Sequence, residues 1–177
     1  MYVDIEIQKQ MVMNTGDNLY DYCQTQSTLL VFLRHFGCVF CKEAMKDLAI
    51  HKPKIEELGG EIVFVHMAEN KKIAEKYFDE FNLPNVKHIG DPDKVFYQEF
   101  GLRKGSFTQL YGLSTWFRGF SPEVKQHKLE ISKSLGDATQ MPGIFHLYQN
   151  RILESYVHTV ASDKPDYVYL VECCLVG

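Results

Sequence analysis

The sequence has no excess of positive charge and no long hydrophobic segment. Its formal net charge is −4, so no broad basic field and no nucleic-acid partner are expected. The longest uncharged apolar stretch runs from Leu29 to Leu33, far too short to span a bilayer. Residues 1–6 include acids where a secretory signal would have basic residues before an apolar run. We therefore expect a cytoplasmic protein that has no membrane partner.

Repeats and low-complexity tracts are also lacking, which favours a single domain over residues 1–177. The chain contains five cysteines. In a cytoplasmic protein, cysteines are more often free, catalytic or metal-bound than joined in a structural disulfide framework. Their chemistry is therefore the first place to look for function.

The first half of the chain has the hydrophobic pattern of alternating strands and helices. Leu29–Leu33 has the length of a parallel strand buried on both faces. After it, Cys41, Met45 and Leu48 recur at the spacing of one helix face. Pro53 is expected to kink or interrupt this helix.

The remaining expected elements of this half are a short strand at Met11–Met13, a strand at Ile62–Val65, a helix carrying Ile73, Tyr77, Phe78 and Phe81, and a short helix opened by Asp91-Pro92-Asp93 with Val95, Phe96 and Phe100 facing inward. Gly59-Gly60 is expected to end the first long helical segment. This β-α-β-α order implies a parallel sheet with helices on both faces.

The second half predicts a hairpin and a final helix. Gly143–Tyr148 and Ile152–His158 are separated by a short polar link and are expected to pair antiparallel. Helical spacing of Tyr167, Leu170, Val171 and Cys174 indicates the last helix. The complete order is that of an α/β thioredoxin-like fold, a central mixed sheet with helices on both faces.

Residues 106–135 do not fit the minimal version of this fold and are interpreted as a helical insertion before the hairpin. The segment is rich in aromatic residues, among them Trp116 and Phe117, and its second part, Pro122 to Lys133, is charged and predicted to be helical. The aromatic side chains could pack in the core or line a substrate groove.

The Cys38-Val39-Phe40-Cys41 motif has the spacing of a thiol–disulfide centre directly after a buried strand. A helix N-terminus lowers the pKa of a cysteine because its free N–H groups and dipole stabilise the thiolate. Arg34, His35 and Lys42 are expected to add positive charge, and Glu43 to oppose it. Cys38 is then the attacking thiolate, and Cys41, one turn later, resolves the intermediate.

Other roles for the cysteines remain open at this point. Cys38 and Cys41 could be small buried hydrophobes, or half of a zinc site completed by His35 and the Cys173-Cys174 pair. The spacing of these residues resembles no zinc ribbon, so no metal and no other cofactor are predicted. Cys23 is expected to be structural or incidental, Cys174 to lie in the core, and Cys173 could serve as a remote resolving thiol.

Three segments resemble a known family: Val31 to Glu43 around the motif, Asp91 to Leu102, and Gly136 to Phe145. They are similar to the peroxiredoxin-like branch of the AhpC/TSA (alkyl hydroperoxide reductase/thiol-specific antioxidant) family. The resemblance extends from about Leu29 to the final helix. It implies a thioredoxin fold and redox activity toward peroxides or disulfides. Where peroxiredoxins have a Thr three residues before the reactive Cys, this chain has His35.

The resemblance also implies which residues surround the substrate. Pro142 matches the cis-proline that faces the CxxC motif in thioredoxins, although an ordinary trans proline at a strand start is the alternative. Met141, Pro142, Gly37 and Phe40 are therefore the expected substrate-binding residues. A thiol reductant such as the thioredoxin or glutathione system would supply electrons, and a homodimer is possible by analogy.

The sequence thus predicts an oxidoreductase that reduces peroxides or disulfides through Cys38 and Cys41. Two alternatives stay open. One is a thioredoxin-like disulfide reductase without peroxidase activity. The other is a redox-silent binding module that holds a partner through the aromatic insertion, although such a module would need neither the nucleophile nor its resolving thiol.

Overall fold

The computed structural model describes residues 3–112, 122 and 132–174. Its centre is a five-stranded sheet in the order β3-β2-β1-β4-β5. The strands are β1 (Ser27–Phe32), β2 (Gly60–His66), β3 (Lys87–Gly90), β4 (Gly143–Tyr148) and β5 (Arg151–Val157). The three strands β1, β2 and β3 are parallel, whereas β4 pairs antiparallel with both β1 and β5. The predicted mixed α/β sheet is therefore confirmed.

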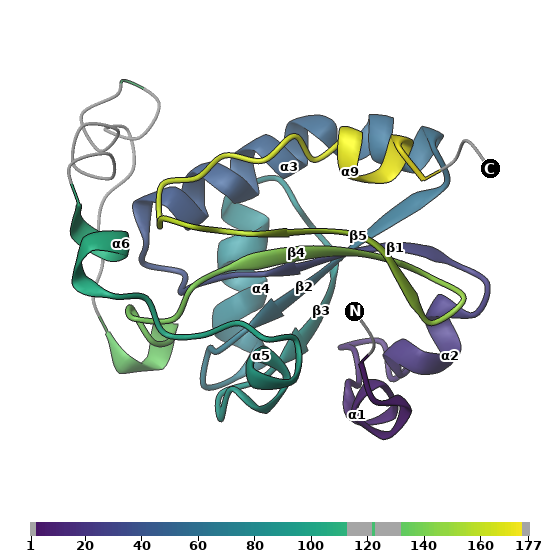
Figure 1. Ribbon diagram of the computed structural model, residues 1–177, viewed down its shortest axis with the longest axis horizontal. Coiled ribbons are helices and arrows are strands. Elements are labelled where there is room, and N and C mark those ends of the chain that lie inside the picture. The colour runs from purple at the N-terminus through teal and green to yellow at the C-terminus, as the bar shows by residue number, and fades with distance from the viewer. Residues whose placement is uncertain (1–2, 113–121, 123–131, 175–177) are drawn as a thin grey trace.

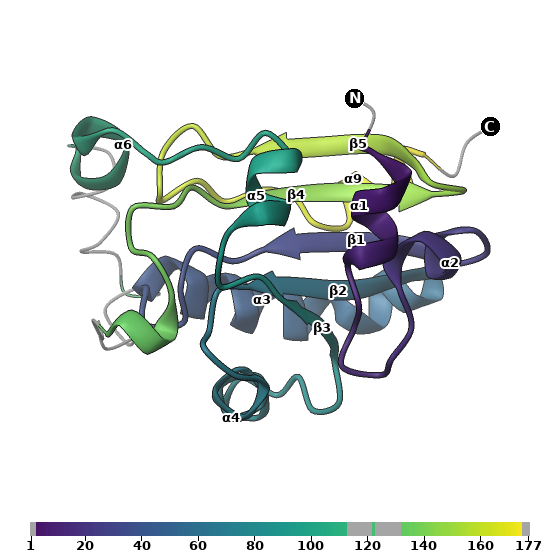
Figure 2. The ribbon, with the colours of Figure 1, turned by 90° about the horizontal axis from the view of Figure 1, so that it is seen from below.

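Helices cover both faces of this sheet (Figures 1 and 2). One face carries α3 (Val39–Glu57), α4 (Lys71–Glu80) and the short α9 (Tyr169–Glu172). The opposite face carries α1 (Ile5–Gln10), α2 (Leu19–Cys23) and α5 (Val95–Glu99). A further helix, α6 (Phe107–Tyr111), and a 3₁₀ turn, η1 (Lys133–Leu135), lie in the segment interpreted as an insertion.

Strand β1 explains how one apolar run serves two cores. Leu29 and Val31 point into the cluster beneath α3 and α4, and Leu30 and Phe32 point into the cluster beneath α1 and α5. Successive side chains of a strand face opposite sides, so an uninterrupted apolar run is what a strand covered on both faces needs. The end of this strand fixes the start of the loop that leads to Cys38.

The hairpin and the long helix agree with the sequence in most respects. Strands β4 and β5 pair antiparallel through a turn at Gln149 and Asn150, both with positive φ. Helix α3 continues past Pro53, so the expected interruption there is wrong. Tertiary packing outweighs the lost backbone hydrogen bond, since Ile55, two residues on, is completely buried.

The expected strand at Met11–Met13 is also wrong. Only Val12 makes an isolated bridge, to Asn18, between α1 and α2. Met11 and Met13 are buried while Val12 is 51% exposed, and this alternation imitates a strand although the segment is a turn between helices.

The short helix after β3 forms where Asp91 predicts it. The Asp91 carboxylate accepts hydrogen bonds from the backbone N–H groups of Val95 and Phe96 at 2.9 and 2.8 Å, which caps the start of α5. Phe100 is buried as expected, but Val95 is exposed and Tyr97 takes the innermost position.

The two predictions about less regular parts of the chain have different outcomes. The final helix is only one turn long, and Cys174 lies beyond it at intermediate exposure, so its expected place in the core is wrong. Trp116, Phe117 and most of the charged stretch from 122 to 133 lie outside the described residues.

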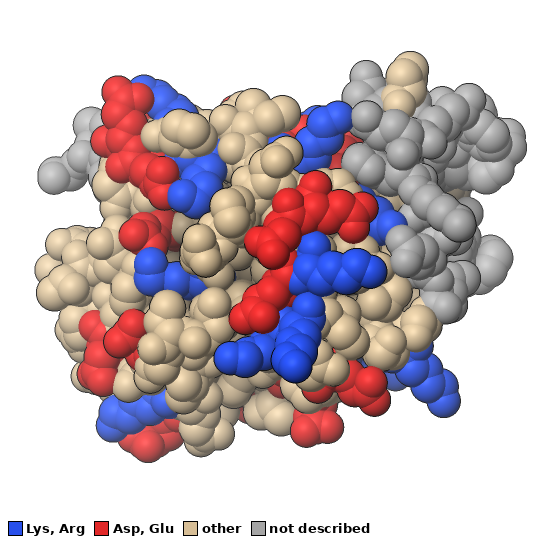
Figure 3. Space-filling model, turned by 180° about the vertical axis from the view of Figure 1, so that it is seen from behind, with Lys and Arg blue, Asp and Glu red and all other residues tan. Residues whose placement is uncertain are grey.

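Within residues 3–112, 122 and 132–174, no helix is long and apolar enough to cross a membrane. On the face drawn in Figure 3, acidic and basic side chains are intermixed and neither sign dominates.

Candidate active site

Cys38 lies where the loop after β1 turns into α3. It occupies the N-cap position with extended backbone angles (φ −74°, ψ 128°), and its N–H donates to the carbonyl of His35 at 3.1 Å. Cys41 lies in the first turn of the helix, and both cysteines are free thiols. The predicted placement of the motif at a helix N-terminus is therefore confirmed.

The surroundings of Cys38 favour its thiolate. The largest influence is a hydrogen bond from the Cys41 thiol, which lowers the pKa of Cys38; burial opposes this, and the positive charge of Arg34 and the backbone N–H groups of Cys41 and Phe40 lower the pKa further. Arg34 Nη1 lies 3.6 Å from Cys38 Sγ and donates a hydrogen bond to it. The net effect is a Cys38 pKa below that of an ordinary thiol.

Cys41 is affected in the opposite direction. Its hydrogen bond to Cys38 and its burial raise its pKa well above the usual value, and the negative charge on Cys38 adds to the effect. These opposite shifts favour Cys41 as the thiol and Cys38 as the thiolate of the pair. This division of roles is the one that an attacking and a resolving cysteine require.

Both cysteines are nevertheless covered by other residues. Cys38 is 3% exposed and Cys41 is 5% exposed, and both belong to the hydrophobic cluster beneath α3. Part of the surrounding structure is held by Arg34, whose Nε donates to the carbonyl of Ala138 at 2.7 Å. A substrate larger than a few atoms can reach Cys38 only if neighbouring segments move.

A small cavity adjoins Cys41 on the side of β4. Its volume is about 30 Å³, and its lining includes Phe40, Cys41 and Pro142. A cavity of at least about 10–15 Å³ can hold one water molecule, so this one has room for a molecule of about that size. Met141 lies beside it and packs with Leu110, Ala161 and Phe40. The structure therefore brings three of the four expected substrate-binding residues, Phe40, Met141 and Pro142, together near Cys41.

Gly37, the fourth, immediately precedes Cys38 and is buried in the loop. The expected cis bond before Pro142 is wrong, since no cis peptide occurs in the described residues. A trans bond is the ordinary state of an X-Pro peptide at a strand start. The Pro142 carbonyl accepts a hydrogen bond from the His158 N–H at 3.4 Å and joins the start of β4 to the end of β5.

Two of the three expected cationic neighbours behave differently from Arg34. Burial and the nearby charge of Arg34 lower the pKa of His35 to about 4, so its ring is neutral at pH 7 and the expected positive charge there is wrong. Lys42 is buried, with its Nζ 5.6 Å from the ring centroid of Tyr77. Glu43 is within 3.6 Å of Lys164 Nζ. Arg34 is thus the cation whose contact with Cys38 Sγ is defined.

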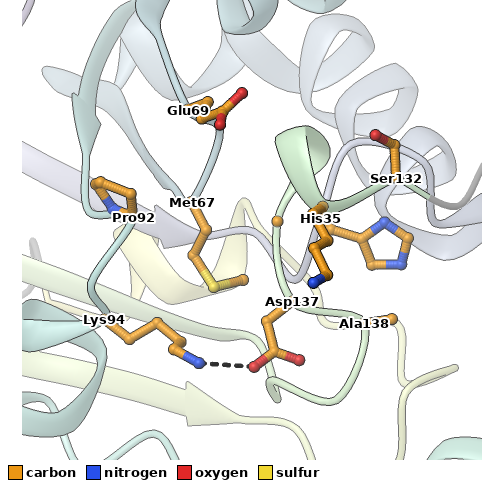
Figure 4. A pocket seen from close by; sticks show the side chains of 10 residues that line it. His35, Met67, Glu69, Pro92, Lys94, Ser132, Asp137 and Ala138 are labelled. Atoms are coloured by element: carbon orange, nitrogen blue, oxygen red, sulfur yellow. Dashed lines mark hydrogen bonds and ion pairs between the residues drawn. The ribbon is translucent and has the colours of Figure 1, made fainter.

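A larger pocket lies on the other side of the loop that carries His35 (Figure 4). It has a volume of about 520 Å³ and is lined by residues that follow β1, β2 and β3, together with the segment from Ser132 to Ala138. Lys94 Nζ and Asp137 Oδ2 form an ion pair of 2.7 Å in its wall. The pocket lies beyond the carboxyl ends of these strands, which is a common place for ligands in open α/β sheets. Neither Cys38 nor Cys41 lines this pocket.

Sequence reasoning missed two groups that position the site. The Tyr97 hydroxyl donates to the carbonyl of Leu33, directly before Arg34, and also approaches the carbonyl of Val65 at 3.0 Å. The Ala138 carbonyl, 104 residues from Arg34, fixes the guanidinium. Both are long-range contacts, and no local pattern in the sequence predicts them.

The described residues around the motif provide no third ligand for a metal. Within the described part of the chain, no group of three or more His, Cys, Asp or Glu side chains is placed to hold an ion. Cys173 and Cys174, the partners of the zinc alternative, directly follow α9, which lies beside the C-terminal part of α3 (Figure 1). That alternative therefore has no geometric support in these residues.

Comparison with known proteins gives likenesses of structure. No family model matches the sequence, and no curated protein is similar enough to match. Peroxidoxin BcpB from Mycobacterium tuberculosis superposes with a TM-score of 0.59 at 13% identity, covering 93% of this chain and 87% of its own. A peroxiredoxin Q mutant from Xanthomonas campestris gives 0.63 at 10% identity, covering 99% and 92%.

A third likeness is to the thiol:disulfide interchange protein DsbE from Chlorobium tepidum, with a TM-score of 0.59 at 16% identity and coverage of 93% and 91%. Identities this low establish the fold and leave the chemistry to be argued from the site. The chain has the peroxiredoxin-like thioredoxin fold.

Proposed function

We propose that this protein is a thiol-dependent oxidoreductase that reduces peroxides or disulfides through Cys38 and Cys41. The observation that carries the proposal is the unequal pair of sulfurs at the start of α3. The pKa of Cys38 is lowered, first by the Cys41 thiol, while that of Cys41 is raised. A structural pair of buried thiols has no need of a guanidinium 3.6 Å from one sulfur.

With a hydroperoxide, the Cys38 thiolate attacks the terminal oxygen. An S–O bond forms, the O–O bond breaks, and the alkoxide takes up a proton from solvent and leaves as an alcohol, or as water from hydrogen peroxide. Cys41 then attacks the Cys38 sulfur, loses its proton, and displaces the hydroxyl group as water. The product is a Cys38–Cys41 disulfide, which two electrons from an external thiol return to the starting state.

With a disulfide substrate, the first step is an exchange. Cys38 forms a mixed disulfide and one substrate sulfur leaves as a thiol, after which Cys41 releases the second. The burial of Cys38 and the small cavity beside Cys41 favour a small peroxide as the substrate that needs least rearrangement. Electrons would come from a thiol system such as thioredoxin or glutathione.

Turnover of hydrogen peroxide and of oxidised glutathione by single variants tests the proposal. Cys38→Ser should abolish both activities, whereas Cys41→Ser should permit the first step and accumulate a mixed disulfide with glutathione on Cys38. Cys173→Ser, a change at a half-buried thiol outside the site, is the matched control and should retain activity. Equal activity of Cys38→Ser and the control would refute the mechanism.

The redox-silent binding module makes the opposite prediction. In that case, neither hydrogen peroxide nor oxidised glutathione would produce a disulfide between Cys38 and Cys41 in the intact protein. The Arg34 contact with Cys38 Sγ favours the oxidoreductase, because a binding module gains nothing from stabilising a thiolate.

A further inference from the structure

A second pair of thiols lies far from Cys38. Cys173 and Cys174 follow α9, and a Cβ placed on Gly60, just beyond the C-terminal end of α3, would lie 3.1 Å from the side chain of Val171 in α9. Cys38 precedes the N-terminal end of the same helix. The 19 residues of α3 span about 28 Å. Within one molecule, the pair is therefore too distant from Cys38 for either thiol to resolve an intermediate there. The predicted role of Cys173 as a remote resolving thiol has no support from this geometry.

The two sulfurs of this pair are directed toward each other. Cys173 Sγ and Cys174 Sγ are 3.4 Å apart, and the Cys173 thiol also approaches the carbonyl of Leu170 at 3.8 Å. Adjacent residues of a helix normally point in different directions, so this approach depends on the turn that follows α9. Both thiols are half-buried, in contrast to the buried Cys23, Cys38 and Cys41.

The geometry selects among ligands that bind sulfur. Zinc holds tetrahedral sulfurs at about 2.3 Å and thus about 3.8 Å apart, and it needs further ligands. The described residues supply no third His, Cys, Asp or Glu for such a site. A disulfide would bring the sulfurs to about 2.0 Å and would need an oxidant. A soft, three-coordinate atom that already carries one organic substituent needs only two sulfur ligands. Bond angles near a right angle place those two sulfurs close together.

We propose that Cys173 and Cys174 form a binding site for trivalent arsenic, with both sulfurs as ligands. An organic arsenoxide reacts with the two thiols so that two As–S bonds form and the arsenic–oxygen double bond breaks. The two thiol protons leave with that oxygen as one molecule of water. Arsenic remains trivalent throughout, so the step needs neither an oxidant nor a reductant.

The state of the thiols agrees with this reaction. Burial and the hydrogen bond with Cys173 raise the pKa of Cys174 to about 11, so Cys174 carries one proton that the departing oxygen takes up. Cys38 and Cys41 also form a dithiol, but they are 3% and 5% exposed. In the folded protein, the arsenical should therefore reach the pair beyond α9 first.

Protection from N-ethylmaleimide tests the site in the folded, full-length protein. Without arsenical, excess reagent at mildly alkaline pH should label Cys173 and, more slowly because of its raised pKa, Cys174, as mapped by mass spectrometry of the digest. One equivalent of phenylarsine oxide should prevent labelling of both residues, and an added dithiol should restore it. In Cys174→Ser, Cys173 should be labelled despite the arsenical, because one sulfur cannot close the chelate.

Cys38→Ser separates this test from the proposed function, since protection at Cys173 and Cys174 should be unchanged in that variant. The proposal is overturned if the untreated pair is not labelled, if both residues remain labelled in the presence of the arsenical, or if Cys173 stays protected in Cys174→Ser. Protection of only Cys38 and Cys41 would overturn it as well.

Discussion

Replacing Arg34 with Met should raise the pKa of Cys38. The guanidinium donates from Nη1 to Cys38 Sγ at 3.6 Å and has a fixed orientation through its Nε bond to Ala138. A hydrogen bond to a charged group contributes about 1.5–3 kcal/mol. One pKa unit corresponds to about 1.4 kcal/mol, so the loss of this contact should raise the pKa by about 1–2 units.

The assay is the ultraviolet absorbance of the thiolate as the pH is raised, corrected with Cys38→Ser. It needs no reagent to enter the buried site. Burial raises the pKa of Cys23 to about 11, and the pKa of Cys41 is also raised, so neither should titrate together with Cys38. Wild type should show a midpoint below that of an ordinary thiol, which is about 8.5.

Two variants control this experiment. Arg34→Lys keeps the charge but cannot hold both the sulfur and the Ala138 carbonyl, so its midpoint should fall between those of wild type and Arg34→Met. Lys42→Met removes another buried cation, which lies over the Tyr77 ring, and it should shift the midpoint less than Arg34→Met does. An unchanged midpoint in Arg34→Met, or a shift no larger than that of Lys42→Met, would refute the reasoning.

Two further predictions concern stability. Tyr97→Phe removes the hydroxyl that donates to the Leu33 carbonyl and should lower the free energy of unfolding by about 1–2 kcal/mol, measured in urea, whereas Tyr169→Phe at a 59% exposed position should change it little. A loss in Tyr97→Phe no greater than in the control would contradict the assigned contact. Burial lowers the pKa of His66 to about 3, and burial also lowers that of its partner His88, whose Nδ1 lies 3.0 Å from His66 Nε2. Because these folded-state values lie below the unfolded value of about 6.5, the buried neutral rings contribute stability above that pH and lose it progressively as the pH falls toward about 3. Between about pH 6 and about pH 5, wild type should lose about 1 kcal/mol more stability than His66→Asn does. Equal losses in the two proteins would show that His66 is not kept neutral by burial.

Local patterns in the sequence predict the sheet and the placement of the motif. The apolar run Leu29–Leu33 marks β1, since only a strand covered on both faces needs such a run. The periodicity from Cys41 onward marks the start of α3, and Asp91 marks the start of α5. Each of these signals depends on residues within one or two turns of each other.

The parts that local patterns do not predict depend on tertiary contacts. The alternation at Met11–Met13 resembles a strand, but both methionines are buried by packing between α1, α2 and the sheet. Pro53 lies in a helix that packing keeps continuous. The neutral state of His35 depends on its burial and on the charge of Arg34. The burial exists only in the folded chain.

The candidate site also has one part that local patterns predict and one part that they do not. CxxC spacing identifies both sulfurs and brings them close enough for the hydrogen bond that is the largest cause of their unequal pKa values. The burial of the sulfurs is not predicted by a local pattern, because it is made by segments distant in the sequence, such as the Ala138 region held by Arg34. The sequence therefore predicts the reacting groups but not the enclosure that limits access to them.

The most direct test of the account is the location of the bond formed when the reduced protein meets one equivalent of hydrogen peroxide. Mass spectrometry of the alkylated digest should show the loss of two hydrogens, with a disulfide joining Cys38 to Cys41 and with Cys23, Cys173 and Cys174 still alkylated. Cys38 and Cys41 recovered as free thiols, with the oxidation elsewhere or absent, would contradict the account.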